Sequence, residues 1–142
     1  MLIDTHSHIY DEVFDSDRDA VVARAREAGV GRILLPAVDG HSYGAMFETA
    51  RRYAGYCFPM MGLHPTSVNA DYKKELAIVS EHLAMPNDYV AIGEIGMDLY
   101  WDKTFLKEQQ FVFEQQIQWA LEYELPIVIH CREAFDYIYN VL

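Results

Sequence analysis

The chain has 142 residues, of which 51% are hydrophobic, and its 22 acidic and 11 basic side chains give a net charge of −11. This composition can bury a sizeable core, so we expect one globular domain over residues 1–142. The charge balance disfavours non-specific duplex binding through a basic face, because such binding needs Lys and Arg to neutralise phosphates.

The apolar runs and the cysteines indicate the cellular compartment of the protein. No run approaches the roughly 18 consecutive apolar residues of a membrane span. Asp4 and His6 interrupt the first apolar run at once, which does not fit a signal peptide. Cys57 and Cys131 form no CxxC pair and do not suggest a disulfide framework. We therefore expect a reduced, cytoplasmic setting and no membrane partner.

Apolar stretches alternate with helical patterns along the whole chain. Five strands are predicted, at 2–4, 32–38, 57–65, 89–96 and 126–131. Helical patterns follow each of them, and Thr104 is a candidate N-cap for the fourth helix. The strands are nearly continuous apolar runs, so we expect them to be covered on both faces.

Such alternation fits either an open doubly wound α/β sheet or a (β/α) barrel of the TIM type. No glycine-rich phosphate loop is present, and polar side chains follow several strand ends: His6, His8, His64, Glu94 and His130. Chemistry at the carboxyl ends of different strands favours the barrel, whose full length is about 250 residues. We therefore expect an incomplete barrel with about five of its eight βα units.

The first strand ends in two histidines. His6 and His8 are two positions apart, so they lie on one face of an extended chain and can share one cation. Two ordinary polar loop residues would give the same pattern.

Glu94 and His130 extend the cluster. Glu94 is embedded among apolar residues, and a buried carboxylate needs a cation, an Arg or Lys partner, or strong donors. His130 could alone be a core histidine with a satisfied hydrogen bond. Together with His6 and His8, they predict a metal centre.

Four motifs in order, DTHSH, GLHP, GEIGMDLYW and HCREA, resemble those of the TatD family of metal-dependent deoxyribonucleases over the whole chain. The resemblance implies a TIM-barrel hydrolase that binds one or two divalent ions (Zn, Mn or Mg) and acts on DNA. It implies that His6, His8 and His130 are metal ligands and that Glu94 is a catalytic residue bridging the metals. The family also uses a His after strand six and an Asp after strand eight, and this sequence contains neither.

The function expected from the resemblance is hydrolysis of phosphodiester bonds, an ester-bond hydrolase reaction, by a metal-activated water. Arg132 is a candidate phosphate contact, because a guanidinium suits bidentate binding, but it could also cap the strand end. His64 could line the substrate site or shape its turn. Tyr100 and Trp101 could stack on bases or pack on the barrel rim. Asp98 could contact substrate or a neighbouring helix.

Two alternatives remain open at this point. Another amidohydrolase-like enzyme, acting on amides or lactones, would also carry an HxH motif. A non-catalytic half-barrel could bind metal and self-associate, because a five-stranded fragment leaves open barrel edges that pair with another chain.

Overall fold

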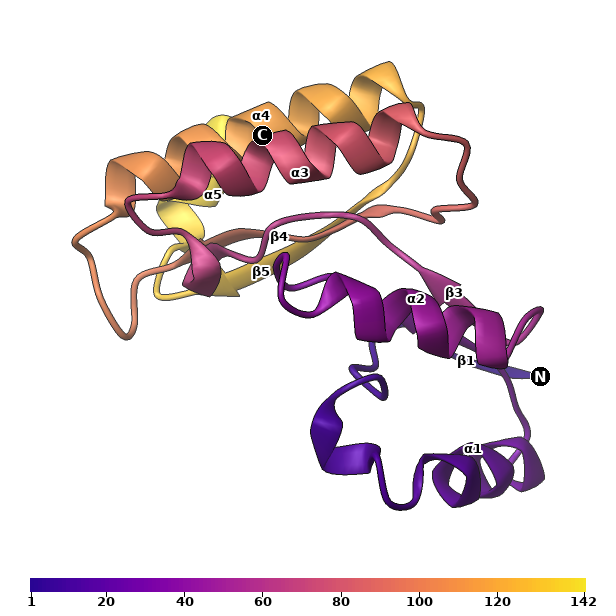
Figure 1. Ribbon diagram of the computed structural model, residues 1–142. Coiled ribbons are helices and arrows are strands. Elements are labelled where there is room, and N and C mark those ends of the chain that lie inside the picture. Colours follow the sequence, from indigo (N-terminus) through magenta and orange to yellow (C-terminus); the bar gives the residue numbers. More distant parts are fainter.

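A computed structural model describes residues 1–142 and shows strands and helices alternating along the chain (Figure 1). The strands are β1 (Leu2–Asp4), β2 (Val30–Leu35), β3 (Cys57–Pro59), β4 (Ile92–Asp98) and β5 (Ile127–Arg132). The α-helices are α1 (Arg18–Glu27), α2 (Tyr43–Arg52), α3 (Tyr72–Ala84), α4 (Leu106–Glu122) and α5 (Phe135–Val141). Two short 3₁₀ helices are η1 (Glu12–Phe14) and η2 (Pro65–Ser67).

All strand pairs are parallel, and neighbours in sequence are neighbours in space. One sheet has the order β1-β2-β3, and β4 pairs with β5. A parallel bridge between Met61 and Ile92 joins the two sheets. The backbone of Ala37 also exchanges hydrogen bonds with Gly93 and Glu94, at 2.9 and 3.2 Å. The predicted succession of βα units is confirmed, and all five strands end on the same side.

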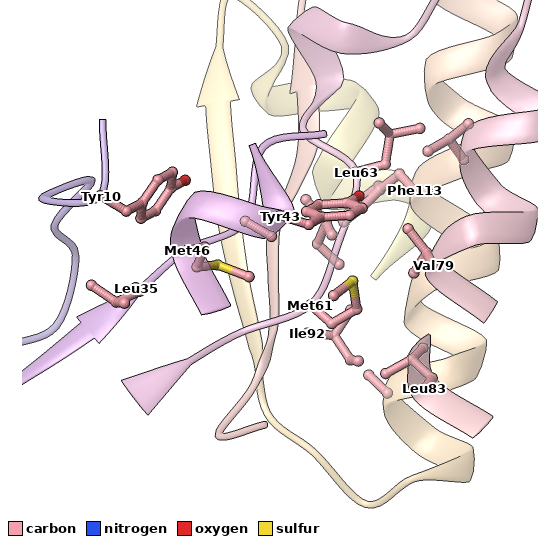
Figure 2. Packing of buried hydrophobic residues seen from close by; sticks show 14 of the residues in the cluster. Tyr10, Leu35, Tyr43, Met46, Met61, Leu63, Val79, Leu83, Ile92 and Phe113 are labelled. Atoms are coloured by element: carbon pink, nitrogen blue, oxygen red, sulfur yellow. The ribbon is translucent and has the colours of Figure 1, made fainter. Parts of the chain in front are cut away.

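The helices cover the strands unevenly. In Figure 1, α3 and α4 run side by side over β4 and β5, whereas α2 packs against β3. Figure 2 shows Phe113 of α4 near Leu63 and Val79, where fully buried side chains of the two helices meet the strand layer. The core is one cluster of 25 buried residues, so the chain forms one hydrophobic unit.

The strands differ in burial, and one expectation about them is wrong. Every residue of β4 is buried, as predicted for a strand covered on both faces. Every residue of β1 is exposed, and in β5 none is fully buried. These are the two outer strands of the order, so no neighbouring strand covers their free edges.

Several predicted boundaries also shift. The second strand ends at Leu35 rather than residue 38, because Pro36 has no N–H to continue the ladder. The fourth strand runs over Ile92–Asp98 rather than 89–96. Thr104 is not the N-cap of α4, since that position is Phe105. The Thr104 backbone N–H and hydroxyl donate to Asp102 instead.

Gly96 lets β4 and β5 approach closely at the point where the strands carry polar side chains. Its φ is +138°, and a Cβ there would lie 2.1 Å from the carbonyl oxygen of His130. Only glycine fits this close backbone contact without a shift of one strand. The contact fixes His130 of β5 beside Glu94 of β4.

Candidate metal centre

Four imidazoles surround one buried carboxylate. Glu94 stands in the middle of β4 with its side chain only 8% exposed. Its Oε2 lies 3.1 Å from Nε2 of His6, 3.6 Å from Nε2 of His8 and 3.6 Å from Nε2 of His64. Its Oε1 lies 3.1 Å from Nδ1 of His130. The structure thus brings together all the residues predicted as metal ligands, and it adds His64.

Asp98 is a second carboxylate in the same cluster. It is four positions after Glu94, so both side chains lie on one face of β4. The Asp98 Oδ2 is 2.8 Å from Nε2 of His130, whose Nδ1 faces Glu94. A neutral imidazole carries one proton, so it can donate to only one of these carboxylates. The other contact requires a second proton on His130, a proton on the carboxylate, or a cation.

A hydrogen-bond chain sets the tautomer of His8. The hydroxyl of buried Tyr10 donates to the carbonyl oxygen of Pro36 at 2.6 Å. That hydroxyl has one hydrogen, so it accepts from Nδ1 of His8, 2.9 Å away. In neutral His8 the lone pair is therefore on Nε2, the atom that faces Glu94. A lone pair and a carboxylate repel each other unless a cation lies between them.

His64 has the opposite tautomer. The backbone N–H of Thr66 donates to Nδ1 of His64 at 3.1 Å, so this nitrogen is unprotonated. Burial, with smaller contributions from His130 and His8, lowers the pKa of His64 to about 4 against the opposing effect of Glu94. At neutral pH the ring is uncharged and its Nε2–H points toward Glu94. His64 therefore acts as a donor in this arrangement.

Glu94 remains ionised despite its burial. Burial raises its pKa, but the surrounding imidazoles in their protonated forms, His8 first and then His64, His6 and His130, outweigh this and hold the pKa at about 2. Since His64 is neutral at pH 7, its contribution there comes from its N–H dipole rather than from a full charge. The site thus contains an anionic carboxylate, surrounded by imidazoles, that can bind a cation.

Two glutamines of α4, which sequence reasoning missed, hold the backbone of the site. The Gln109 side chain accepts from the N–H of Asp98 at 2.8 Å and donates to its carbonyl at 3.0 Å. Gln116 does the same for Leu63, next to His64, at 2.7 and 3.2 Å. Both glutamines are buried. Because they are seven residues apart among apolar positions, they share one helix face, and that spacing is the signal that could have identified them.

Arg132 lies outside the imidazole cluster. Its guanidinium carbon is 3.8 Å from the ring centre of Tyr100 and 5.2 Å from that of Trp101. Trp101 is 71% exposed and Tyr100 is 53% exposed, so these rings do not pack down on the strand ends. The three side chains form a rim beside the centre.

The donor set fits a divalent cation. Ligand atoms of His6, His8 and Glu94 lie within 4.8 Å of one another, and so do those of His64, Glu94 and His130. The tautomer of His64 argues against this residue as a ligand, which leaves Glu94 and His130 in the second group. Imidazole nitrogen with carboxylate oxygen suits Zn²⁺ and Mn²⁺.

The sequence matches the family described as "TatD related DNase" over residues 3–142. The chain belongs to the TatD family. It is 33% identical over 135 residues to YjjV of Escherichia coli (strain K12), described as an uncharacterized metal-dependent hydrolase, covering 94% of this chain and 52% of that protein. It is 37% identical over 123 residues to a TatD protein of Pantoea sp. (strain At-9b), described as a 3'-5' ssDNA/RNA exonuclease, covering 87% of this chain and 47% of the relative.

Solved TatD structures share the fold. The crystal structure of YjjV from Escherichia coli superposes with a TM-score of 0.87 at 33% identity, over 96% of this chain and 53% of that one. A TatD family hydrolase from Entamoeba histolytica shares the fold with a TM-score of 0.77 at 21% identity, over 99% of this chain and 52% of that one. The predicted incomplete TIM-type barrel is confirmed, and the chain spans about half the length of these TatD relatives.

Proposed function

We propose that this chain carries the metal centre of a TatD-type hydrolase that cleaves phosphodiester bonds in DNA. The observation that carries the proposal is the lone pair of His8, held by Tyr10, which faces the ionised Glu94 across 3.6 Å. A cation is the simplest partner for both. His6, His8, Glu94 and His130 would hold one or two divalent ions, Zn²⁺, Mn²⁺ or Mg²⁺. When bound, such ions activate water and neutralise the charge of a phosphate.

The protein's own groups have separate tasks in this proposal. Glu94 is the catalytic residue, since its two oxygens face different histidines and can fix two cations relative to each other. The N–H of His64 is aimed into the site and would donate to an anionic oxygen of the substrate. Arg132 would hold a neighbouring phosphate, because its guanidinium is exposed beside the centre.

Metal binding is tested by calorimetry with Mn²⁺ and Zn²⁺. The double variant His6→Ala/His8→Ala should lose tight binding, whereas His41→Ala, an exposed histidine outside the cluster, should retain it. Equal affinity in the double variant and the parent would contradict the proposed ligands. We expect weaker binding than in a complete barrel, because the family's His after strand six and Asp after strand eight are absent from this sequence.

Activity is tested on single-stranded DNA labelled at its 5′ end, with Mg²⁺ or Mn²⁺ and with a chelator. Cleavage should be slow, because a missing general base costs about 10²- to 10⁴-fold. It should stop with the chelator and in Glu94→Gln. Cleavage by Glu94→Gln at the parent rate would refute the role of Glu94. A parallel screen of amides and lactones tests the alternative that the chain is another amidohydrolase-like enzyme. This alternative is the weaker one, because relatives of the chain are described as nucleases.

The second candidate is a non-catalytic half-barrel that binds metal and self-associates, and the exposed outer strands favour it. Ile3 and Ile129 are 47% and 36% exposed on β1 and β5, and both strands have a free edge. Free edges pair with other chains, and a two-fold dimer would cover both. Light scattering at micromolar concentration should show a dimer or larger species, and a folded 16.4 kDa monomer would argue against association.

A cytoplasmic location completes the proposal, and the two free cysteines are consistent with a reducing compartment. No helix of the structure combines the length and the apolar character needed to cross a bilayer. Fractionation of cells producing the protein would test the location, and recovery in a secreted fraction would contradict it.

A further inference from the structure

A cleft of about 440 Å³ opens next to the metal centre, between η2 and the loop that follows β4. That loop joins β4 to α4 (orange in Figure 1). Val68, Trp101 and Phe105 give the cleft apolar walls, and Asn69, Asp98 and Asp102 give it polar ones. Asp98 belongs to both sites, since its other contact is His130 of the metal centre. The cleft and the metal centre are therefore neighbours that share the Asp98 side chain.

Trp101 is placed to receive a flat ligand. It is 71% exposed, although a tryptophan in a soluble protein usually buries most of its surface. Its ring meets Tyr100 edge to face at 4.8 Å, and the guanidinium carbon of Arg132 lies 5.2 Å from its centre, but most of the indole surface stays exposed. Arg132 lies over Tyr100 at 3.8 Å and so braces the pair from the β5 side. The indole is held in position and remains open to solvent.

Charge decides which part of a nucleotide would enter the cleft. Asp98 and Asp102 line it, and two carboxylates repel a phosphate group. A base carries no charge and stacks on an indole. The side-chain oxygen of Asn69 accepts from the N–H of Asp71, so its NH₂ group remains available for a carbonyl on a base edge. The guanidinium carbon of Arg132 lies 5.2 Å from the indole centre of Trp101, so a cation that can bind phosphate stands beside the cleft.

We propose that the cleft binds one base of a single-stranded nucleic acid, stacked on Trp101, and that Arg132 holds the adjoining phosphate. The identity of the ligand rests on the proposed nuclease function, whereas the site itself rests on the exposed indole and the cleft. Base–aromatic stacking tolerates any base, so the site selects unpaired strands rather than a sequence.

The test measures binding without chemistry. The full 142-residue chain is titrated into a fluorescein-labelled octathymidylate with a chelator present, and the fluorescence anisotropy is followed. Trp101→Ala should weaken binding about 5- to 150-fold, the range for loss of one stacked base. Trp101→Phe should fall in between. Tyr139→Ala is the matched control, because Tyr139 is also 71% exposed but lies on α5 outside the cleft.

A second probe separates the base from the phosphate. An abasic octamer should bind the parent about as weakly as octathymidylate binds Trp101→Ala. If the abasic octamer binds as well as octathymidylate, or if Trp101→Ala and Tyr139→Ala behave alike, the base site is wrong. Undetectable binding at millimolar concentration would also overturn it. Failure of cleavage with intact, Trp101-dependent binding would instead refute the nuclease function and leave the base site standing.

Discussion

The candidate metal centre takes its residues from strand β4 and from the segment that follows β1, among others, and these two strands are held in different ways. β4 is buried along its whole length, and the backbone of Asp98 at its end is gripped by Gln109. β1 is exposed along its whole length, and His6 and His8 follow it with side chains 40% and 35% exposed. The carboxylates are thus built into the core, whereas the first two imidazoles approach from an open edge.

Because of this difference, substitutions in the two strands should affect folding stability and metal binding to different extents. Substitutions around β4 should act on folding and on the site together, because the strand serves both. Substitutions near β1 should change the site with little cost in folding, unless another chain covers the edge. Metal bound between the two strands would join them and add its binding free energy to the stability of the folded chain.

The largest expected effect is the contrast between two isoleucines. Ile95 on β4 is fully buried, and Ile95→Ala should lower the free energy of unfolding by about 2–5 kcal/mol through lost burial and a cavity. Ile3 on β1 is 47% exposed, and Ile3→Ala should cost about 1 kcal/mol. Urea unfolding at several protein concentrations measures both. A cost for Ile3→Ala that grows with concentration would mean that self-association covers β1, and equal costs would refute the contrast.

The next effect is a loss of stability on mild acidification. His64 is buried with its pKa lowered from 6.5 to about 4, so the unfolded chain binds more protons between these values. Stability from this residue is complete above pH 6.5 and falls as the pH drops toward 4, by about 2–3 kcal/mol. The contribution of Glu94, whose pKa is lowered from 4.5 to about 2, is lost only below pH 4.5. His64→Gln should flatten the unfolding profile between pH 6.5 and 4, and an unchanged slope would show that His64 is not the cause.

The strands and the first ligands of the site could be predicted from sequence because they depend on local patterns. His6 and His8 are two residues apart on an extended segment, Glu94 is embedded in an apolar run, and His130 ends one. The period of a strand places such side chains on one face without further information. The same rule could have placed Asp98, four residues after Glu94, in the cluster.

Other parts depend on contacts between distant segments, which no local pattern encodes. The bond of Tyr10 to Pro36 spans 26 residues and decides the tautomer of His8. Gln116 reaches Leu63 over 53 residues. The exposure of β1 was missed for a related reason. An apolar run indicates a strand that can be covered on both faces, but coverage depends on a neighbouring strand.

Gly96→Ala should disturb both strands at the site. The added Cβ would meet the His130 carbonyl at 2.1 Å, so β5 must shift, at a cost of about 1–3 kcal/mol. Mn²⁺ affinity should fall as well, because His130 moves with the strand. Gly44→Ala is the control, since a Cβ there meets nothing within 4 Å and alanine favours the α2 helix. Thermal unfolding and calorimetry check both. Parent-like stability of Gly96→Ala would show that the strands do not require this close contact.

The smallest expected effect concerns Tyr10, whose hydroxyl supports His8 after the exposed strand β1. Tyr10→Phe removes the acceptor that holds the His8 proton on Nδ1. Neutral His8 can then also carry its proton on Nε2, and in that tautomer no lone pair faces Glu94. Mn²⁺ affinity should fall about 10-fold, the lower end for loss of a partner that orients a metal-binding histidine. Tyr43→Phe is matched to it, because Tyr43 is also buried and donates to a backbone carbonyl, that of Gly62, at 2.7 Å. Both variants should lose about 1 kcal/mol of folding stability. Only Tyr10→Phe should bind Mn²⁺ more weakly in calorimetry, and equal affinities would mean that the orientation of His8 does not depend on Tyr10.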